Sequence, residues 1–230
     1  MESRNYDIRR HVLQYDDVMN QQRNIIYGQR REVLEGGDMR ARIQTMRKTL
    51  ITEAVGRHAP DEAAAEHWDI AGLSEYLEHL CIDKGGVQKV FDELPKKDKK
   101  SFVEALDARA QRIYELREKM WEDNKLDMRE FERVALLGAV DRRWMDHIDA
   151  MTELRDGIGL RALAQRDPVV EYKLEGFEMF DEMVRMIQED TMKRLYFTVI
   201  TPRQPLERKQ VATPVVASHG EQTAKRQVGS

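Results

Sequence analysis

Apolar residues recur at three- and four-residue steps over the first segment of the chain, from about Asn5 to Glu35. They are Ile8, Val12, Tyr15, Val18, Met19, Ile26 and Val33. Groups at this spacing line one face of an α-helix, and Gln22 and Arg30 interrupt the stripe. Roughly 30 helical residues would extend about 45 Å. A helix of this length cannot bury its apolar face alone, so we expect other helices to pack on it.

A second helix is predicted after a break at Gly36 and Gly37. Two glycines end a helix readily, and Asp38 can cap the next helix by accepting backbone N–H bonds. The stripe of this helix consists of Ile43, Met46, Leu50 and Ala54. Pro60 is expected to close it.

The stretch from about Gly56 to Asn124 reads as a small helical subdomain. Asp69 is expected to cap one of its helices, and Gly85-Gly86 separates a short further helix. Ser101 and Glu104 form the S-x-x-E pattern of a capping box, which predicts the start of a longer helix. The apolar residues of these helices are Ile70, Leu73, Leu77, Leu80, Val87, Val90, Phe91, Leu94, Leu106, Ala110, Ile113 and Met120.

The most regular pattern predicts an antiparallel pair of helices. The first stripe comprises Leu137, Val140, Trp144, Ile148, Met151, Leu154 and Ile158. The second comprises Val170, Leu174, Phe177, Phe180, Val184 and Ile187. We expect the glycines of Asp156–Gly159 to end the first helix, and Asp167 with Pro168 to begin the second. The stripes can then pack against each other, with Trp144, Ile148, Phe177 and Phe180 among the packing residues.

The loop between these two helices contains Leu160 and Leu163, for which no local core is evident. Apolar residues exposed on a projecting loop favour contact with another molecule. The alternative, that the loop folds back on its own helices, carries equal weight.

Composition narrows the class of protein. The 230 residues include 38 Lys and Arg against 42 Asp and Glu, a formal net charge of −4. A nucleic-acid binder usually shows a basic excess, so we expect no nucleic-acid partner. No apolar run approaches the roughly 20 residues of a membrane span, and MESRNYDIRR lacks the apolar segment of a secretory signal. The sequence therefore predicts an all-α, cytoplasmic protein.

From Thr201 onward the helical pattern ends. Pro202, Pro205 and Pro214 occur among Ser, Thr, Gln and Gly, and five basic residues accompany two acidic ones. This composition is typical of a flexible, solvated tail.

No side-chain set in the sequence converges as a catalytic or metal site would. Neither G-x-x-x-x-G-K-[ST] nor H-E-x-x-H occurs. Asp16 and Asp17 are adjacent, so on a helix they point in different directions. Glu75 and His79 share a helix face, but two ligands leave a zinc site incomplete, and the single Cys81 adds none on that face. We expect no catalytic residue, no metal ligand and no cofactor in this chain.

Two long segments resemble the SecA family of preprotein translocase ATPases. Residues Arg4–Arg23, RNYDIRRHVLQYDDVMNQQR, are similar to the start of that family's helical scaffold. Residues Asp141–Phe180, DRRWMDHIDAMTELRDGIGLRALAQRDPVVEYKLEGFEMF, resemble its two-helix finger. Between them, His67–Ile70 and Gly72–Leu73 resemble its helical wing. The resemblance covers roughly residues 2–200, without the last thirty residues and without the motor-domain motifs, so it implies a C-terminal part of the family.

This resemblance implies a domain organisation. Residues 1–40 would form the long scaffold helix, and 41–127 an inserted helical wing. Residues 128–200 would complete the scaffold with the two-helix finger, and 201–230 would form a disordered tail.

The resemblance also implies a function. The chain would be part of a motor that uses ATP to drive unfolded preproteins through the SecYEG channel. ATP and Mg²⁺ would bind the parent motor, so no ATPase activity is expected from this chain alone. The implied partners are the SecYEG channel, the unfolded preprotein, the SecA motor domains, a second copy in a homodimer and, indirectly, the acidic membrane surface. The implied location is the cytoplasm and the inner face of the plasma membrane, and the implied role includes restraint of the idle ATPase.

In this family the finger loop contacts the polypeptide and the channel. The matching positions are Leu160, Arg161, Ala162, Leu163, Ala164 and Gln165. Leu163 takes the tip position, where many relatives carry Tyr, and Gly159 stands where many carry His. An adaptable apolar tip suits contact with many different sequences.

A different hypothesis is a stand-alone helical adaptor without motor activity. It predicts a stable, monodisperse fold. An exposed stripe from Ile8 to Ile26 would argue against it, because an orphan apolar face tends to self-associate.

Overall fold

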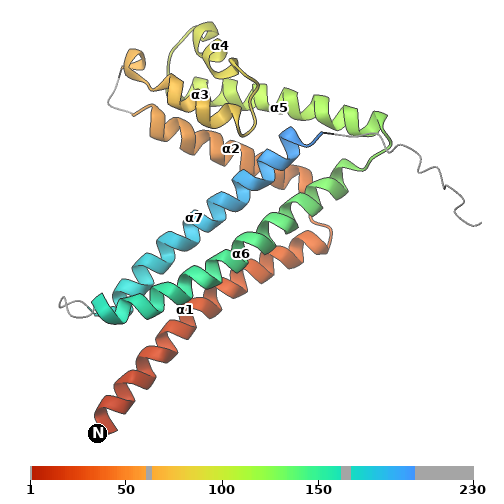
Figure 1. Ribbon diagram of the computed structural model, residues 1–230. Coiled ribbons are helices and arrows are strands. Elements are labelled where there is room, and N and C mark those ends of the chain that lie inside the picture. Colours follow the sequence, from red (N-terminus) through yellow and green to blue (C-terminus); the bar gives the residue numbers. More distant parts are fainter. Residues whose placement is uncertain (1, 61–63, 162–166, 200–230) are drawn as a thin grey trace, which may run out of the picture. The chain divides into compact units, whose positions relative to one another are not determined.

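The computed structural model describes the backbone of residues 2–60, 64–161 and 167–199, and the side chains of residues 13–60, 64–158 and 167–199. Within these ranges the chain forms seven α-helices, one short 3-10 helix and no strand (Figure 1). The all-α prediction is therefore confirmed. Residues Met1–Val199 form one compact unit. The tail predicted for residues 201–230 lies outside the described residues.

Three long helices lie side by side: α1 (Glu2–Leu34), α6 (Met128–Arg161) and α7 (Pro168–Phe197) (Figure 1). We call helices α6 and α7 the two arms of the finger; α1 packs along both of them. The buried residues between the three helices include Ile26, Val33, Leu136, Ala139, Val140, Trp144, Phe180, Met183 and Ile187. The α1 stripe thus has the helical partners that its length and pattern predicted.

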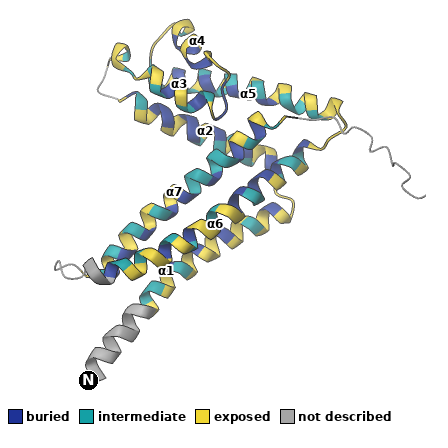
Figure 2. Cartoon of the chain, viewed as in Figure 1, coloured by how far each residue is buried: buried dark blue, intermediate teal, exposed yellow. Residues whose placement is uncertain are grey.

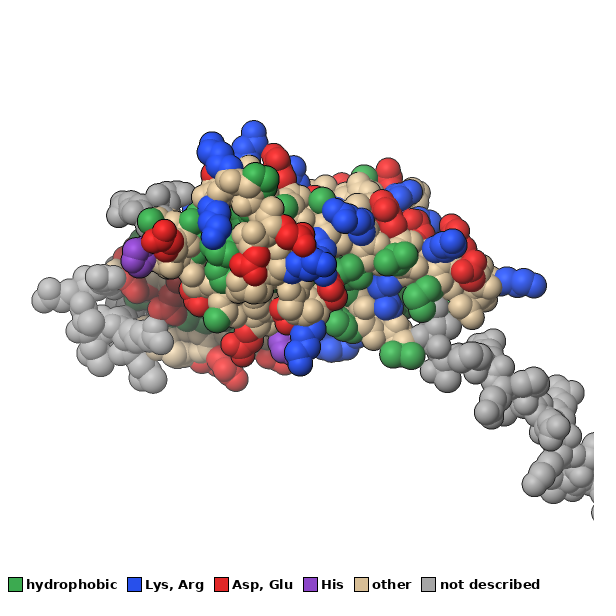
Figure 3. Space-filling view, turned by 90° about the horizontal axis from the view of Figure 1, so that it is seen from above, with side chains coloured by type: hydrophobic (Ala, Val, Ile, Leu, Met, Phe, Trp, Pro, Cys, Tyr) green, Lys and Arg blue, Asp and Glu red, His purple; other side chains and the backbone are tan. Residues whose placement is uncertain are grey.

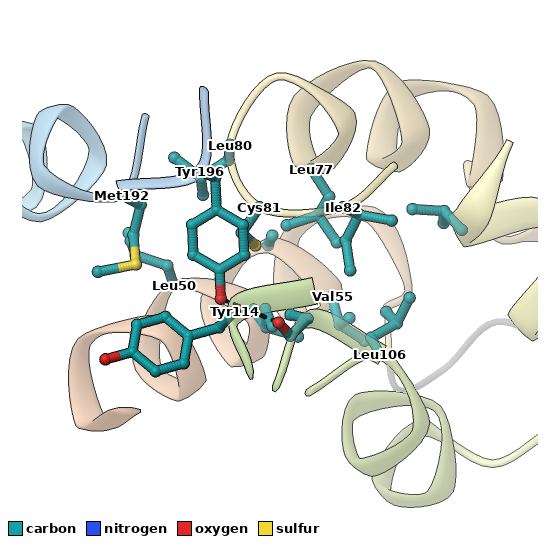
Figure 4. Packing of buried hydrophobic residues seen from close by; sticks show 14 of the residues in the cluster. Leu50, Val55, Leu77, Leu80, Cys81, Ile82, Leu106, Tyr114, Met192 and Tyr196 are labelled. Carbon is teal, nitrogen blue, oxygen red and sulfur yellow. Dashed lines mark hydrogen bonds between the residues drawn. The ribbon is translucent and has the colours of Figure 1, made fainter. Parts of the chain in front are cut away.

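The remaining helices pack together at one end of the three long helices (Figure 1). They are α2 (Met39–His58), the 3-10 helix η1 (Ala65–His67), α3 (Ile70–Glu78), α4 (Gly86–Glu93) and α5 (Lys99–Asp123). We call this region the wing. Its core is a single large apolar cluster, part of which Figure 4 shows; the members include Ile43, Leu50, Ile51, Val55, Leu73, Leu77, Ile82, Val87, Phe102, Leu106 and Tyr114.

The helix caps of the wing were predicted in part. Asp38 and Asp69 each accept a hydrogen bond from the backbone N–H three residues later, at 3.0 and 2.9 Å, so both predicted caps are confirmed. The predicted capping box of Ser101 and Glu104 is wrong. Asp98 is the N-cap of α5 and accepts from both the backbone N–H and the hydroxyl of Ser101. A carboxylate is a strong N-cap acceptor, and here it also engages the Ser101 hydroxyl.

Helix α7 continues from the finger into the core of the wing. Its last residues, Met192, Leu195 and Tyr196, are buried within the wing cluster (Figure 4). The Tyr196 hydroxyl donates to the backbone oxygen of Ala110 at 3.0 Å. The wing and the finger therefore share one continuous helix.

A buried charged cluster occupies the corner where α5 turns into α6. Glu132 is fully buried and accepts hydrogen bonds from the Tyr114 hydroxyl and from Arg129. Arg129 also pairs with Glu118. Burial raises the pKa of Glu132, whereas the Tyr114 hydrogen bond and the charge of Arg129 oppose that rise.

The surface carries charges of both signs. Figure 3 shows Lys and Arg side chains interspersed with Asp and Glu over one face. Among the described residues, no helix combines the length and the apolar character that crossing a bilayer requires.

Candidate functional site

The first arm of the finger is longer than predicted. We expected Asp156–Gly159 to end it, but α6 continues through both glycines to Arg161. A glycine inside a helix costs about 1 kcal/mol. Ile158 lies between the two glycines and is buried in a cluster with Tyr172 of α7. We attribute the continuation of α6 to this packing.

The predicted loop residues fall partly on this last turn. Leu160 and Arg161 have helical backbone, and their side chains lie outside the described residues, as do Ala162, Leu163, Ala164 and Gln165 entirely. Their contact role stays a prediction.

The second arm begins as the sequence predicted. Asp167 caps α7 by accepting from the backbone N–H of Val169 at 2.9 Å, and Pro168 is its first residue. Asp167 is a suitable acceptor there, and proline has no N–H to leave unpaired. The α7 end of the loop is therefore fixed at Asp167.

Buried and exposed positions are mixed along α6 and α7 (Figure 2). The predicted packing residues divide into two groups. Trp144 and Phe180 are buried in the cluster that α1, α6 and α7 share, and Ile148 packs against it. Phe177 does not pack there, because its side chain is 59% exposed. The prediction for Phe177 is wrong: it follows Gly176, whose backbone faces α1, and so points about 100° away from that interface.

Near the loop, α1 meets both arms through aromatic and apolar contacts. Tyr15 of α1 and Tyr172 of α7 pack edge to face, with ring centroids 4.7 Å apart. Val18 of α1 and Met151 of α6 are buried in the same cluster as Tyr172. The loop end of the finger is thus attached to the scaffold helix.

A buried polar contact joins all three helices. The side-chain amide of Gln22 on α1 donates to the backbone oxygen of Gly176 on α7 at 3.0 Å. The Gln22 carbonyl oxygen lies 2.9 Å from Nε2 of His147 on α6, so this oxygen accepts when Nε2 carries the proton. A Cβ at Gly176 would lie 2.9 Å from Cε of Met151, the flexible end of a side chain on α6. Burial lowers the pKa of His147, which favours the neutral imidazole.

Sequence reasoning missed this contact. It treated Gln22 as an interruption of an apolar stripe and gave neither Gln22 nor His147 a partner. The two residues lie 125 positions apart, so no local pattern links them. A polar residue in the middle of an otherwise apolar stripe was the available signal, because a buried polar group requires a partner.

The outer surface of the finger is partly apolar. Val170, Leu174 and Phe177 follow one another on α7 at helical spacing, and all three are more than half exposed. Between the arms lies a pocket of about 200 Å³, to which Met179, Met183, Met186, Ala150, His147, Arg143, Asp146 and Glu182 contribute. Methionine side chains adapt readily to different apolar partners.

No metal centre is evident in the part of the chain that the structure describes. There, no three His, Cys, Asp or Glu side chains are grouped so that they could hold an ion. Cys81 is buried, and burial raises the pKa of its thiol to about 12.

Comparison with known proteins gives the family directly. The family model described as "SecA Wing and Scaffold domain" matches residues 1–198. This range includes all seven α-helices described above.

Several curated relatives are similar along almost the whole chain. A protein translocase subunit SecA 1 from Alkaliphilus metalliredigens is 44% identical over 226 residues, which cover 98% of this chain and 25% of the relative. The SecA subunit of Pelotomaculum thermopropionicum is 44% identical over 229 residues, covering 99% of this chain and 25% of the relative. SecA 1 of Clostridioides difficile is 46% identical over 216 residues, covering 92% and 23%.

These alignments extend the resemblance seen in the sequence. Coverage of 98–99% reaches into residues 201–230, which that resemblance left out. The chain spans about a quarter of the length of these relatives. The chain belongs to the SecA family, of which it represents the wing and scaffold region.

Proposed function

We propose that this chain is the part of a SecA preprotein translocase that links its motor domains to the translocating polypeptide. The finger loop contacts the unfolded preprotein and the SecYEG channel. ATP and Mg²⁺ act in the motor domains of the complete protein. The proposal rests on the helix α7, which runs from the finger loop into the core of the wing.

Helix α7 has the properties of a mechanical link. It has 30 residues, which corresponds to about 45 Å at 1.5 Å per residue. Asp167 caps it beside the loop, and Leu195 and Tyr196 are buried in the wing at its other end. A displacement at the loop would therefore be transmitted along α7 rather than absorbed within the finger.

Helix α1 is the proposed route to the motor domains. It packs on both finger arms through its buried stripe, and Gln22 fixes its register against α6 and α7. Outside this stripe, α1 exposes Leu13, Ile25, Tyr27 and Leu34. Several apolar side chains exposed along one helix favour contact with another protein. We propose that the motor domains cover these residues. We also propose that this contact restrains the idle ATPase.

The test is photocrosslinking in a complete motor that carries this segment. A photoreactive amino acid replaces Leu163, and the motor is stalled on a preprotein in SecYEG membranes. The expected result is an adduct with the preprotein or with the channel. A probe at Lys89, an exposed residue of α4 in the wing, is the matched control. If Leu163 gives no more adduct than Lys89, the proposed role of the loop is wrong.

The second candidate is a stand-alone adaptor. One observation supports the adaptor: Val18, Ile26 and Val33 of the α1 stripe are buried within this chain. The exposed stripe that would have argued against an adaptor is therefore covered at these positions. The exposed apolar residues of α1, such as Leu13 and Tyr27, still favour association with another protein. Sedimentation of the isolated chain distinguishes the two hypotheses, since a monodisperse monomer supports the adaptor and concentration-dependent association supports missing motor domains.

A further inference from the structure

A cavity of about 340 Å³ lies where α1, α2, α6 and α7 meet. Its apolar walls come from Val33 of α1, Met46 of α2, Leu136 and Val140 of α6, and Ile187 of α7. All of these except Met46 are buried members of the core that the three long helices share, and Met46 packs against that core. The cavity therefore reaches into the core at the junction of the scaffold helix, the wing and the finger.

Polar side chains line the same cavity. Gln29 and Arg30 come from α1, Arg42 from α2 and Gln188 from α7. Each of these side chains carries N–H groups that can donate hydrogen bonds. Apolar walls with a small number of polar groups are typical of sites that bind small molecules.

Arg30 has a donor without an acceptor among the described residues. Its Nε atom is buried and makes no hydrogen bond there. Asp141 Oδ1 lies 3.1 Å from Nε, and Nη2 donates to Asp141 Oδ2 at 3.3 Å. Since Nε lies within hydrogen-bond distance of Asp141 without making the bond, its N–H is not directed at that oxygen. A buried donor without an acceptor is costly, so this site favours a ligand that brings an acceptor oxygen.

The guanidinium of Arg42 also keeps donors for a ligand. It pairs through Nη2 with Glu32 at 2.6 Å, and a guanidinium has five N–H groups. The side chains of Glu32 and Asp141 are 67% and 57% exposed, and ion pairs with such exposed carboxylates contribute little. Both arginines can therefore also bind a carboxylate that enters the cavity.

We propose that this cavity binds a single-chain amphipathic carboxylate. The hydrocarbon chain lies against the apolar walls, and the carboxylate accepts hydrogen bonds from Arg30 and Arg42, to which it is matched in charge and in geometry. The volume of about 340 Å³ is near the lower end of the roughly 300–1,000 Å³ found for small-ligand sites, so one chain fits better than a two-chain lipid. The bound ligand contacts all four helices and stabilises the junction of wing and finger. This inference concerns the chain alone and does not depend on the proposed function.

Isothermal titration calorimetry of the full chain with decanoate tests the proposal. Leu137 lines the cavity and is partly exposed, so Leu137→Trp fills the cavity without replacing a fully buried residue. Leu174→Trp, on the exposed surface of α7, is the matched control. We expect one saturable site, which is lost in Leu137→Trp and unchanged in Leu174→Trp, because a filled cavity leaves no room for the chain. No saturable binding, or equal effects of the two substitutions, would overturn the proposal.

A second pair of variants tests the carboxylate contact. Arg42→Gln should weaken the binding of decanoate roughly tenfold, because hydrogen bonds between charged groups are lost, and should weaken that of 1-decanol, the uncharged analogue, much less. Arg23→Gln is the control for net charge, since Arg23 is exposed and its Nη1 donates to Asn20 of its own helix. Equal losses of decanoate binding in Arg42→Gln and Arg23→Gln would overturn the assigned carboxylate position.

Methyl NMR of the unmodified chain locates the ligand without any substitution. Bound decanoate should shift the methyl resonances of Val140 and Ile187, which line the cavity. The methyl groups of Leu73 and Leu77, in the wing core, are the internal controls. Binding that leaves Val140 and Ile187 unshifted would place the ligand elsewhere and overturn the proposal.

Discussion

The wing and the finger differ in how they bury their apolar side chains. The wing gathers its four α-helices, the start of α6 and the end of α7 around one large apolar cluster, with members such as Leu73, Leu77 and Phe102 fully buried. The finger has two long arms, which are covered by α1 and, through Met39 and Met46, by α2. Its arms consequently keep large apolar side chains exposed, among them Met145, Leu174 and Phe177.

The difference extends to what fixes each region. Shape complementarity of many apolar side chains specifies the wing core. In the finger, smaller clusters are joined by one buried polar contact between Gln22, His147 and Gly176. Such a contact specifies the register of three long helices that could otherwise slide along their apolar stripes. We infer that the wing provides stability and the finger provides a defined, exposed surface.

A matched pair of Leu→Ala variants, one in each region, should show the largest difference in the free energy of unfolding. Leu73→Ala removes a fully buried side chain of the wing and should lower the free energy of unfolding by about 2–5 kcal/mol. Leu174→Ala, at a position 58% exposed on the finger, should change it by less than about 0.5 kcal/mol. Urea denaturation followed by circular dichroism measures both. Similar losses for the two variants would refute the contrast between the regions.

The second effect concerns the polar contact of the finger. Gln22→Ala leaves the buried His147 ring without its partner and should cost about 1–3 kcal/mol. Gln21→Ala is the matched control, since Gln21 is exposed and its side-chain amide donates to Asp17 of its own helix. A loss for Gln22→Ala no larger than for Gln21→Ala, in the same denaturation assay, would show that the contact does not stabilise the three helices.

A third and smaller effect is expected at the base of the finger loop. Asp167→Ala removes the cap of α7 and should cost about 1 kcal/mol, whereas Asp167→Asn keeps an acceptor and should cost less. Hydrogen exchange of the first α7 amides reports this locally. If exchange became equally faster in both variants, the charge of Asp167, rather than its hydrogen bond to the helix, would stabilise the start of α7.

The fourth effect is the dependence of stability on pH. Burial lowers the pKa of His147 below its usual value of 6.5. The unfolded chain therefore binds a proton near pH 6.5 that the folded chain takes up only at lower pH. Stability contributed by this group is fully present above pH 6.5, and it is lost as the pH falls from there towards the folded pKa, by at most about 1.4 kcal/mol per pH unit.

Its test compares free energies of unfolding at pH 7.5 and pH 5.5. His147→Gln, which keeps a donor for Gln22, should reduce the loss at low pH. His79→Gln changes an exposed histidine and should leave it unaltered. An identical pH dependence for the two variants would exclude His147 as the source.

Much of this fold follows from local sequence patterns, and the failures have physical causes. The apolar stripes located the long helices, and Asp38, Asp69 and Asp167 marked helix starts, because both signals depend only on nearby residues. The end of α6 was misplaced because the burial of Ile158 against Tyr172 is a tertiary effect that local propensity does not contain.

The candidate site was less predictable for the same reason. Phe177 fits the apolar spacing of its helix, but only the position of α1 decides which part of that broad stripe is covered. The pairing of Gln22 with His147 likewise depends on how three helices meet. The loop positions came from family resemblance, since composition and periodicity could not assign them a partner.

We infer that α7 makes the wing and the finger move as one body. Spin labels at Leu174, on the finger, and at Lys89, on the wing, report the distance between the two regions by pulsed electron resonance. A pair at Lys89 and Glu122, within the wing, is the control. In a complete motor, idle and stalled on a preprotein, we expect one narrow distance distribution that is the same in both states. A distribution that shifts or broadens on stalling, while the control pair stays unchanged, would contradict it.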